Sequence, residues 1–127
     1  MYASLLDLNV GCYHIELSPG YQKIYTIVLP WGKYKHQKLS MGVCNSTNIF
    51  QENISELFKG FDLVREYIDG VLLITKNDFN GHLNVLEKSL QRFTEEVFRL
   101  NTEKLFFGRI ETKYIGLWVS SNGARPL

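Results

Sequence analysis

The sequence predicts an α+β domain in which two helices cover one face of a mainly antiparallel sheet. Three patterns predict this class. Short β-prone segments recur along the chain, an Asp-Gly pair at residues 69–70 separates two of them, and apolar residues repeat at helical spacing near 45–59 and 78–98. A chain of 127 residues is long enough to bury a core as one domain.

The composition is that of an ordinary globular chain. Hydrophobic residues make up 45% and charged residues 21%, and the net charge of +1 predicts only local contact with nucleic acid. Cys12 and Cys44 form no disulfide framework and no metal-spaced pair, which predicts a reduced, intracellular protein, cytoplasmic or nuclear. No signal peptide and no apolar run near the roughly 20 residues of a membrane span is present, so we expect neither secretion nor a membrane partner.

The first third of the chain is predicted to be mostly strand. Residues 3–8 and 12–17 have strand patterns on either side of a break at Asn9-Val10-Gly11, because apolar residues alternate at positions 13, 15 and 17. A turn is expected at 18–20 and a β-branched strand at 25–29.

Residues 33–38 alternate basic side chains with aromatic or polar ones. Lys33, Lys35 and Lys38 could lie along a phosphate backbone, because cationic side chains displace its counterions while rings stack on bases. A solvated hairpin is the alternative interpretation of the same pattern.

Two helices are expected in the middle of the chain. Asn45 or Ser46 is the predicted cap of the first, which ends at Gly60, and Asp78 is the predicted N-cap of the second. The residues predicted to form their buried faces are Phe50, Ile54, Leu57, Phe58, Leu83, Leu86, Leu90, Phe93 and Val97.

Further strands are predicted at 100–107 and 114–120, with a turn at Asn122-Gly123.

Asp69 lies at a predicted hairpin tip that has two interpretations. Asp-Gly between apolar β-prone residues is a strong structural turn signal, because both residues tolerate positive φ. Alternatively, the rigid hairpin holds an acidic side chain for chemistry. Asp7 is the one acidic residue of another apolar strand, and if the two strands are neighbours the carboxylates meet and repel, which a divalent cation relieves. The pair therefore predicts a two-metal site.

The blocks around these residues resemble the palm of a reverse transcriptase, most closely that of gypsy-type LTR retrotransposons. The resemblance extends over nearly all of the chain and implies an α+β palm, with part of the fingers at about 20–40. By the same resemblance, residues 1–127 form a reverse transcriptase fragment without complete fingers, thumb or RNase H. The blocks that carry it are Leu6-Asp7-Leu8 with Gly11 and Tyr13-His14-Ile15, Leu29 to Tyr34, Met41 to Ser46 with Phe50-Gln51, Tyr67-Ile68-Asp69, Leu100-Asn101 with Lys104, and Tyr114-Ile115-Gly116 with Asn122-Gly123.

The resemblance implies an RNA-directed DNA polymerase that uses Mg²⁺ or Mn²⁺. Its implied partners are an RNA or DNA template-primer, a deoxynucleoside triphosphate and the missing regions of the polyprotein. The residues that match the family positions are Asp7 and Asp69 as catalytic residues and metal ligands, Leu8 as a metal ligand through its carbonyl, Cys12, Met41, Gly42 and Lys104 at the nucleotide, Tyr114, Ile115 and Gly116 at the primer end, and Lys33, Lys35 and Lys38 along nucleic acid.

This chain departs from the family where the family uses special residues. The hairpin motif of the family is Tyr-x-Asp-Asp, and Gly70 stands at the second Asp. A lost carboxylate predicts impaired or absent polymerase activity, because two dications then have fewer ligands. Other departures are Cys12 for a Tyr or Phe, Ser40 and Thr47 for prolines, and Val97 for a helix-ending Gly.

Two of these departures carry expectations of their own. Cys12 is too small to exclude a 2′-hydroxyl, which predicts weaker sugar discrimination; the alternative is a small buried thiol. Val97 is expected to be strained, because a β-branched residue is disfavoured at positive φ.

The departures leave two alternatives to an active enzyme. The chain could be a catalytically silent nucleic-acid-binding or interaction module that keeps the fold. It could also be a decayed reading frame without function.

Overall fold

The computed structural model describes residues 1–9, 11–76 and 78–127, and its centre is a four-stranded sheet. In the order β4-β5-β1-β6, neighbouring strands all pair antiparallel, which confirms the predicted sheet type. The strands are β1 (Tyr2–Asp7), β4 (Val64–Tyr67), β5 (Gly70–Thr75) and β6 (Phe106–Arg109).

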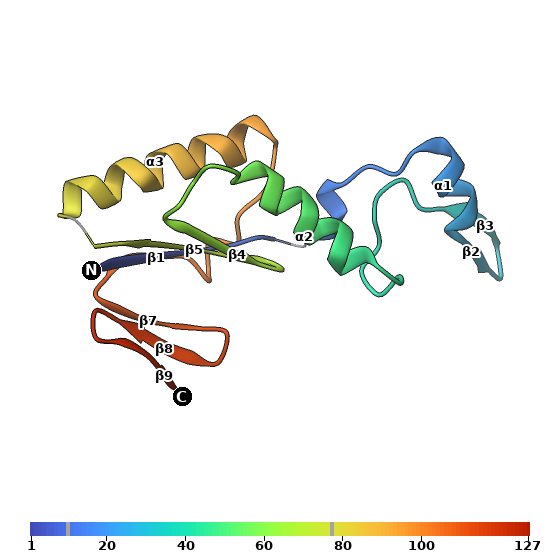
Figure 1. Ribbon diagram of the computed structural model, residues 1–127. Coiled ribbons are helices and arrows are strands. Elements are labelled where there is room, and N and C mark those ends of the chain that lie inside the picture. The colour runs from blue at the N-terminus through green and yellow to red at the C-terminus, as the bar shows by residue number, and fades with distance from the viewer. Residues whose placement is uncertain (10, 77) are drawn as a thin grey trace.

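Two helices, α2 (Ser46–Leu57) and α3 (Phe79–Glu95), lie over the same side of this sheet (Figure 1). Both were predicted, and Asp78 caps α3 as expected, because its Oδ1 accepts from the Gly81 N–H at 3.3 Å. Asn45 is the N-cap of α2 but makes no side-chain cap bond. The core between helices and sheet contains Leu6, Leu8, Phe50, Ile54, Phe58, Val64, Val71, Leu73, Leu86 and Phe93.

A separate three-stranded sheet lies on the other side of the central sheet (Figure 1). It consists of β7 (Glu111–Tyr114), β8 (Leu117–Ser120) and β9 (Gly123–Pro126). The prediction of one strand over 114–120 was wrong, because Ile115 (φ 49°) and Gly116 (φ 72°) form a tight turn inside it.

The segment between β1 and α2 extends away from the rest of the molecule (Figure 1). It contains α1 (Pro19–Ile24) and the hairpin of β2 (Thr26–Leu29) and β3 (Gly32–Lys35). The strand predicted at 25–29 is confirmed. The turn predicted at 18–20 is instead the start of α1, because Pro19 is well suited to the first helical position.

The strand predicted at 12–17 was also wrong, because a 3₁₀ turn, η1 (Gly11–His14), starts there. Its bends are fixed by bonds within the segment, from the Ile15 N–H to Cys12 O (3.1 Å) and from His14 Nδ1 to Gly11 O (3.2 Å). Val10, in the predicted break, lies outside the described residues.

The strand predicted at 100–107 is only partly present. Leu100 forms an isolated bridge with Leu8, and regular pairing resumes at Phe106. Among the described residues, no helix is both long and apolar enough to cross a membrane.

The buried face of α3 contains Leu86 and Phe93, as predicted, but differs from the prediction in the first turn of the helix. Leu83 is 42% exposed, whereas His82 is fully buried. The imidazole is satisfied by two hydroxyls, Ser4 Oγ at 2.7 Å and Thr75 Oγ1 at 2.9 Å, and Ser4 Oγ also accepts from the Gly108 N–H. This network joins α3 to β1, β5 and β6, and a polar residue on the buried face could not be anticipated from apolar spacing.

Stability should therefore fall in mild acid. Burial lowers the pKa of His82 from its ordinary value of 6.5, so below that pH the unfolded chain takes up a proton that the folded chain does not. The free energy of unfolding should then decrease as the pH falls through 6.5 towards the folded pKa. Urea unfolding between pH 7.5 and 5 should show this slope, and His82→Gln should reduce it; equal slopes for both proteins would contradict the assignment.

The C-terminus of α3 contains the strain that was expected at Val97. The Val97 N–H donates to Thr94 O (3.2 Å) and the Phe98 N–H to Phe93 O (2.9 Å), which is the bonding pattern of a Schellman cap. Val97 has φ 58° at the position where this cap favours glycine, and its side chain is 74% exposed. The packing of Phe98 on Phe93, with ring centroids 6.1 Å apart, maintains the turn.

Val97→Gly should stabilise the chain by about 1 kcal/mol, because relief of a left-handed β-branched residue exceeds the added entropy of the unfolded glycine. Thermal or urea unfolding measures this gain. Val28 is a matched control, since it is 70% exposed but lies in the extended backbone of β2, where glycine should destabilise. A loss of stability in Val97→Gly would contradict the strain.

Candidate functional site

Asp7 and Asp69 lie next to each other at one end of the central sheet. Asp7 ends β1 and pairs with Gly70 of β5, and the Leu8 N–H donates to Asp69 O at 2.7 Å. The two acidic residues, 62 positions apart in the sequence, are therefore neighbours, as the predicted strand pairing required.

The hairpin that carries Asp69 turns one residue earlier than the Asp-Gly pair suggested. Tyr67 pairs with Gly70, so Ile68 and Asp69 are the turn residues and Gly70 is the first residue of β5. Positive φ occurs at Ile68 (52°), a β-branched residue in which that conformation is strained. Asp69 is exposed at the tip.

One cavity of about 300 Å³ brings together most of the predicted site residues. Those that line it are Asp7, Leu8, Cys12, Met41, Gly42, Asp69 and Lys104. Sequence reasoning gave no site role to five further lining residues, Asn9, Gly11, Thr47, Ile68 and Asn101. Asn9 could have been predicted from its place two residues after Asp7, because alternate residues of an extended segment share a face.

Lys104 is the positive group nearest to Asp7. Its Nζ lies 3.9 Å from Asp7 Oδ1, and the Asp7 side chain is 20% exposed. Burial raises the pKa of the Asp7 carboxyl above its usual value, Lys104 acts against this shift and Asp69 adds to it. The cavity thus holds one partly desolvated carboxyl, that of Asp7, next to the exposed Asp69, and the exposed ammonium of Lys104 lies beside Asp7.

Backbone bonds fasten the segment after α3 to the end of β1. The Asn101 N–H donates to Asp7 O (2.7 Å), and the Asn9 N–H donates to Arg99 O (2.9 Å). Lys104 follows in a turn, with its N–H on Asn101 O at 3.2 Å. The first two bonds form the Leu8–Leu100 bridge, and the turn that follows ends this pairing and brings Lys104 to Asp7.

Cys12 is half-buried, so both interpretations of it retain support. Its side chain packs against the core and also lines the cavity. Burial raises the pKa of the thiol, and the nearby Asp69 carboxylate raises it further. Met41 is 56% exposed, and Gly42, with φ 88°, has no atom within 4 Å of where a Cβ would lie. The Met41-Gly42 side of the cavity is therefore open.

The remaining predicted residues do not line this cavity. Tyr114 instead bonds to the Asp69 hairpin, with its hydroxyl donating to Arg65 O (3.2 Å) and Gly70 O (3.4 Å), and burial with the Glu66 charge raises its pKa to about 12. Ile115 and Gly116 form the exposed β7–β8 turn. Lys33, Lys35 and Lys38 are all exposed, the first two on β3.

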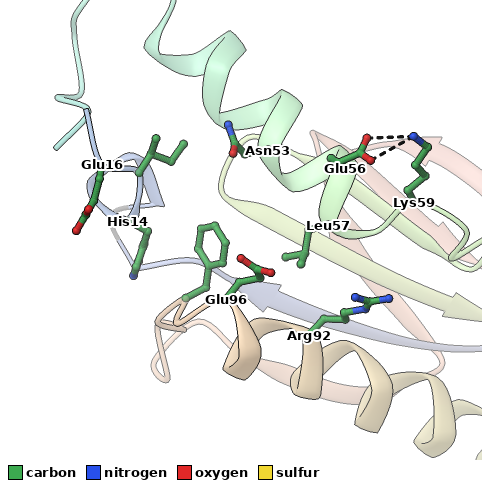
Figure 2. Close-up of a pocket in the computed structure, with 10 residues that line it drawn as sticks. His14, Glu16, Asn53, Glu56, Leu57, Lys59, Arg92 and Glu96 are labelled. Carbon is green, nitrogen blue, oxygen red and sulfur yellow. Dashed lines mark hydrogen bonds and ion pairs between the residues drawn. The ribbon is translucent and has the colours of Figure 1, made fainter. Parts of the chain in front are cut away.

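A second cavity, of about 440 Å³, lies between η1, α2 and the end of α3 (Figure 2). Figure 2 shows His14, Arg92 and Glu96 around it and the Glu56–Lys59 ion pair of 3.2 Å at its margin. His14 is held at both ring nitrogens, because Nε2 accepts from the Arg99 N–H at 3.0 Å while Nδ1 donates to Gly11 O. This residue therefore fastens η1, and none of the predicted site residues lines the cavity.

Asp7 and Asp69 could hold a divalent cation. Carboxylate and carbonyl oxygens are the ligands that Mg²⁺ prefers, and Leu8 supplies a backbone carbonyl beside them. Across residues 1–9, 11–76 and 78–127, no group of three or more His, Cys, Asp or Glu side chains converges. The donor set fits a cation that takes its remaining ligands from water or substrate, as Mg²⁺ commonly does.

The family model for reverse transcriptase (RNA-dependent DNA polymerase) matches residues 1–119. The chain belongs to the reverse transcriptase family. Its relatives include the enzymatic polyprotein of Soybean chlorotic mottle virus, 28% identical over 97% of this chain and 18% of the relative. They also include the Pol polyprotein from transposon gypsy of Drosophila melanogaster, 24% identical over 98% of this chain and 12% of the relative.

Solved reverse transcriptases share the fold. The foamy viral protease-reverse transcriptase in complex with RNA/DNA hybrid superposes with a TM-score of 0.91 at 22% identity, covering 99% of this chain and 17% of that one. Its complex with dsDNA gives 0.89 at 22% identity and covers 26% of that chain. The α+β reverse transcriptase fold is thus confirmed, and this chain spans about a quarter or less of these relatives.

Proposed function

We propose that this chain is the palm, with part of the fingers, of an RNA-directed DNA polymerase from a gypsy-type LTR retrotransposon polyprotein. The proposal rests mainly on one observation, the adjacency of Asp7 and Asp69 in a cavity that Met41, Gly42 and Lys104 also line. The projecting α1-β2-β3 segment supports the assignment of about 20–40 to the fingers. Fingers, thumb and RNase H regions elsewhere in a polyprotein would complete the enzyme.

In this proposal Asp7, Asp69 and the Leu8 carbonyl hold Mg²⁺ or Mn²⁺. Divalent cations held there would supply the acidification of the primer 3′-hydroxyl and the neutralisation of charge on the triphosphate that two-metal nucleotidyl transfer needs. Burial of Asp7 limits the water that competes for its oxygens, and the strand pairing fixes its distance from the Asp69 turn. Lys104, on an exposed side chain, can move from Asp7 to a phosphate oxygen.

The nucleotide and the template-primer are assigned to the open parts of the site. A deoxynucleoside triphosphate fits the Met41-Gly42 side, where no Cβ blocks the approach of the sugar and Cys12 leaves space beneath it. The primer end would lie along the exposed turn at Ile115 and Gly116. Lys33, Lys35 and Lys38 present positive charge to a template phosphate backbone.

We propose that this copy is impaired because Gly70 gives no oxygen where the family motif has a second Asp. A catalytically silent nucleic-acid-binding remnant is the second candidate, favoured by Gly70 together with the exposed lysines of 33–38. A salt-dependent affinity for a primer–template duplex without nucleotide incorporation would favour this candidate.

A chimera tests both functions. The palm is grafted between an intact relative's fingers, thumb and RNase H, and primer extension is measured against the same graft with Asp7→Asn and Asp69→Asn. Extension above this control supports polymerase function. Equal rates, with duplex binding retained, would reject catalysis by this copy and support the binding role.

A further inference from the structure

Gln51 of α2 connects that helix to the turn that carries Asp69. Its Oε1 accepts from the Ile68 N–H at 2.7 Å, and its Nε2 donates to Ser55 Oγ (3.2 Å) and Glu66 O (3.4 Å). Gln51 is half-buried, so water replaces these bonds only in part. We propose that Gln51 is a positioning residue that fixes the Asp69 turn relative to Asp7. The inference deepens the proposed function and relies on it only for the importance of Asp69.

The bond to Ile68 lies where the hairpin is strained. Tyr67 and Gly70 pair across the strands, so the Ile68 N–H lies outside the ladder, and φ at Ile68 is 52°. A β-branched residue in this conformation persists only when its surroundings hold it. The Gln51 amide is a charge-neutral acceptor at short distance. The residue that it holds, Ile68, directly precedes Asp69, whose carboxylate must be oriented.

A second bond holds the other side of Asp69. The Tyr114 hydroxyl donates to Gly70 O at 3.4 Å and to Arg65 O at 3.2 Å. Residues 68 and 70, which flank Asp69, are therefore attached to α2 and β7 respectively. The Leu8 N–H holds the Asp69 carbonyl itself at 2.7 Å, and of the two side-chain restraints on the flanking residues Gln51 gives the shorter bond.

The helix that carries Gln51 also lines the candidate nucleotide pocket. Thr47, four residues earlier and thus on the same face of α2, lines the cavity with Met41 and Gly42. A single rigid helix thereby links the nucleotide side of the cavity to the turn of Asp69. Displacement of the turn by loss of the Gln51 bond would move Asp69 while the Asp7 backbone bonds stay intact.

The experiment compares Gln51→Met, which has similar size but no acceptor, with Gln51→Glu, which keeps the acceptor. Amide hydrogen exchange at Ile68 and the carboxyl carbon chemical shift of Asp69 are measured by NMR, and Mn²⁺ binding by electron paramagnetic resonance. Gln91→Met is the matched control, since Gln91 is exposed on α3 and bonds only to Glu95 in the described structure (3.1 Å).

We expect Gln51→Met to speed Ile68 exchange at least tenfold, to shift the Asp69 carboxyl signal and to weaken Mn²⁺ binding about 10- to 100-fold, the range for loss of a residue that orients a metal ligand. Gln51→Glu should keep the Ile68 exchange rate within about threefold, and Gln91→Met should change none of the three readouts.

Two results would overturn the proposal. One is an unchanged Ile68 exchange rate in Gln51→Met, and the other is faster exchange with an unmoved Asp69 signal, which would leave Gln51 a purely structural role. If the unaltered chain binds no Mn²⁺, the metal site under Proposed function fails. The exchange and chemical-shift measurements decide the role of Gln51 in that case too.

Discussion

Gly70→Asp should raise primer extension by the grafted palm at least about a hundredfold. Loss of one group that stabilises developing charge in an active site costs on the order of 10²–10³ in rate, and the substitution restores such a group. Gly70 pairs directly with Asp7, and directly opposed residues of an antiparallel pair point to the same face of the sheet. The new carboxylate would therefore lie opposite Asp7.

The backbone accepts this substitution. Gly70 has no positive φ, and a Cβ there would meet Tyr114 Cε2 at 3.7 Å, Leu5 Cδ1 at 3.8 Å and Tyr67 O at 3.8 Å, all ordinary contacts. The backbone at position 70 therefore does not require glycine. Because like charges opposed on a sheet repel, the variant should also depend more steeply on divalent cation than the unaltered graft.

Single-nucleotide incorporation on a primed template, measured across a Mg²⁺ titration, tests this prediction. Gly20→Asp is the matched control, because it adds the same charge in exposed α1, where a Cβ meets nothing within 4 Å. An unaltered graft that already extends primers as fast as the Gly70→Asp graft would show that Asp7 and Asp69 suffice. The impairment assigned to Gly70 would then be wrong.

The adjacency of Asp7 and Asp69 could be predicted from sequence because strand pairing has few solutions. The apolar strands β1 and β5 bury their side chains in one register only, and a slip by one residue would expose Leu6 and Val71. The same logic predicted both covering helices. Their apolar spacing is insensitive to the identity of any single residue, so Leu86 and Phe93 are buried as predicted although His82 is buried in place of Leu83.

Local turns were harder to predict, because distant contacts override their sequence preferences. Asp69-Gly70 has the composition of a two-residue turn, yet the turn falls at Ile68 and Asp69, and Gln51, 17 positions earlier, bonds to its strained residue. Similarly, the alternation at 12–17 predicts a strand, but a 3₁₀ turn forms there, held by bonds within the segment and by the bond from the Arg99 N–H, 85 positions away, to His14. Rules of residue spacing do not predict such distant partners as Gln51 and Arg99.

Phe93→Ala should destabilise the chain by about 3–5 kcal/mol, the cost of truncating a buried aromatic side chain. Phe93 is 2% exposed, and its ring lies 5.1 Å from that of Phe58 and 6.1 Å from that of Phe98. Since small domains are stable by only about 5–15 kcal/mol, much of the chain should be unfolded or loosened at 37 °C.

Loss of the Phe93 ring should also disturb the candidate site around Asp7. Phe58 follows α2 and Phe98 follows α3, so the ring holds the end of one helix against the segment that leads to Arg99 and Lys104. Urea unfolding measures the loss, with Phe107→Ala as control, because Phe107 is 52% exposed and its truncation should cost no more than about 0.5 kcal/mol. Equal losses for the two variants would mean that the core between α2 and α3 does not hold the fold together. In that case the strand pairing of β1 with β5 alone would have to keep Asp7 beside Asp69.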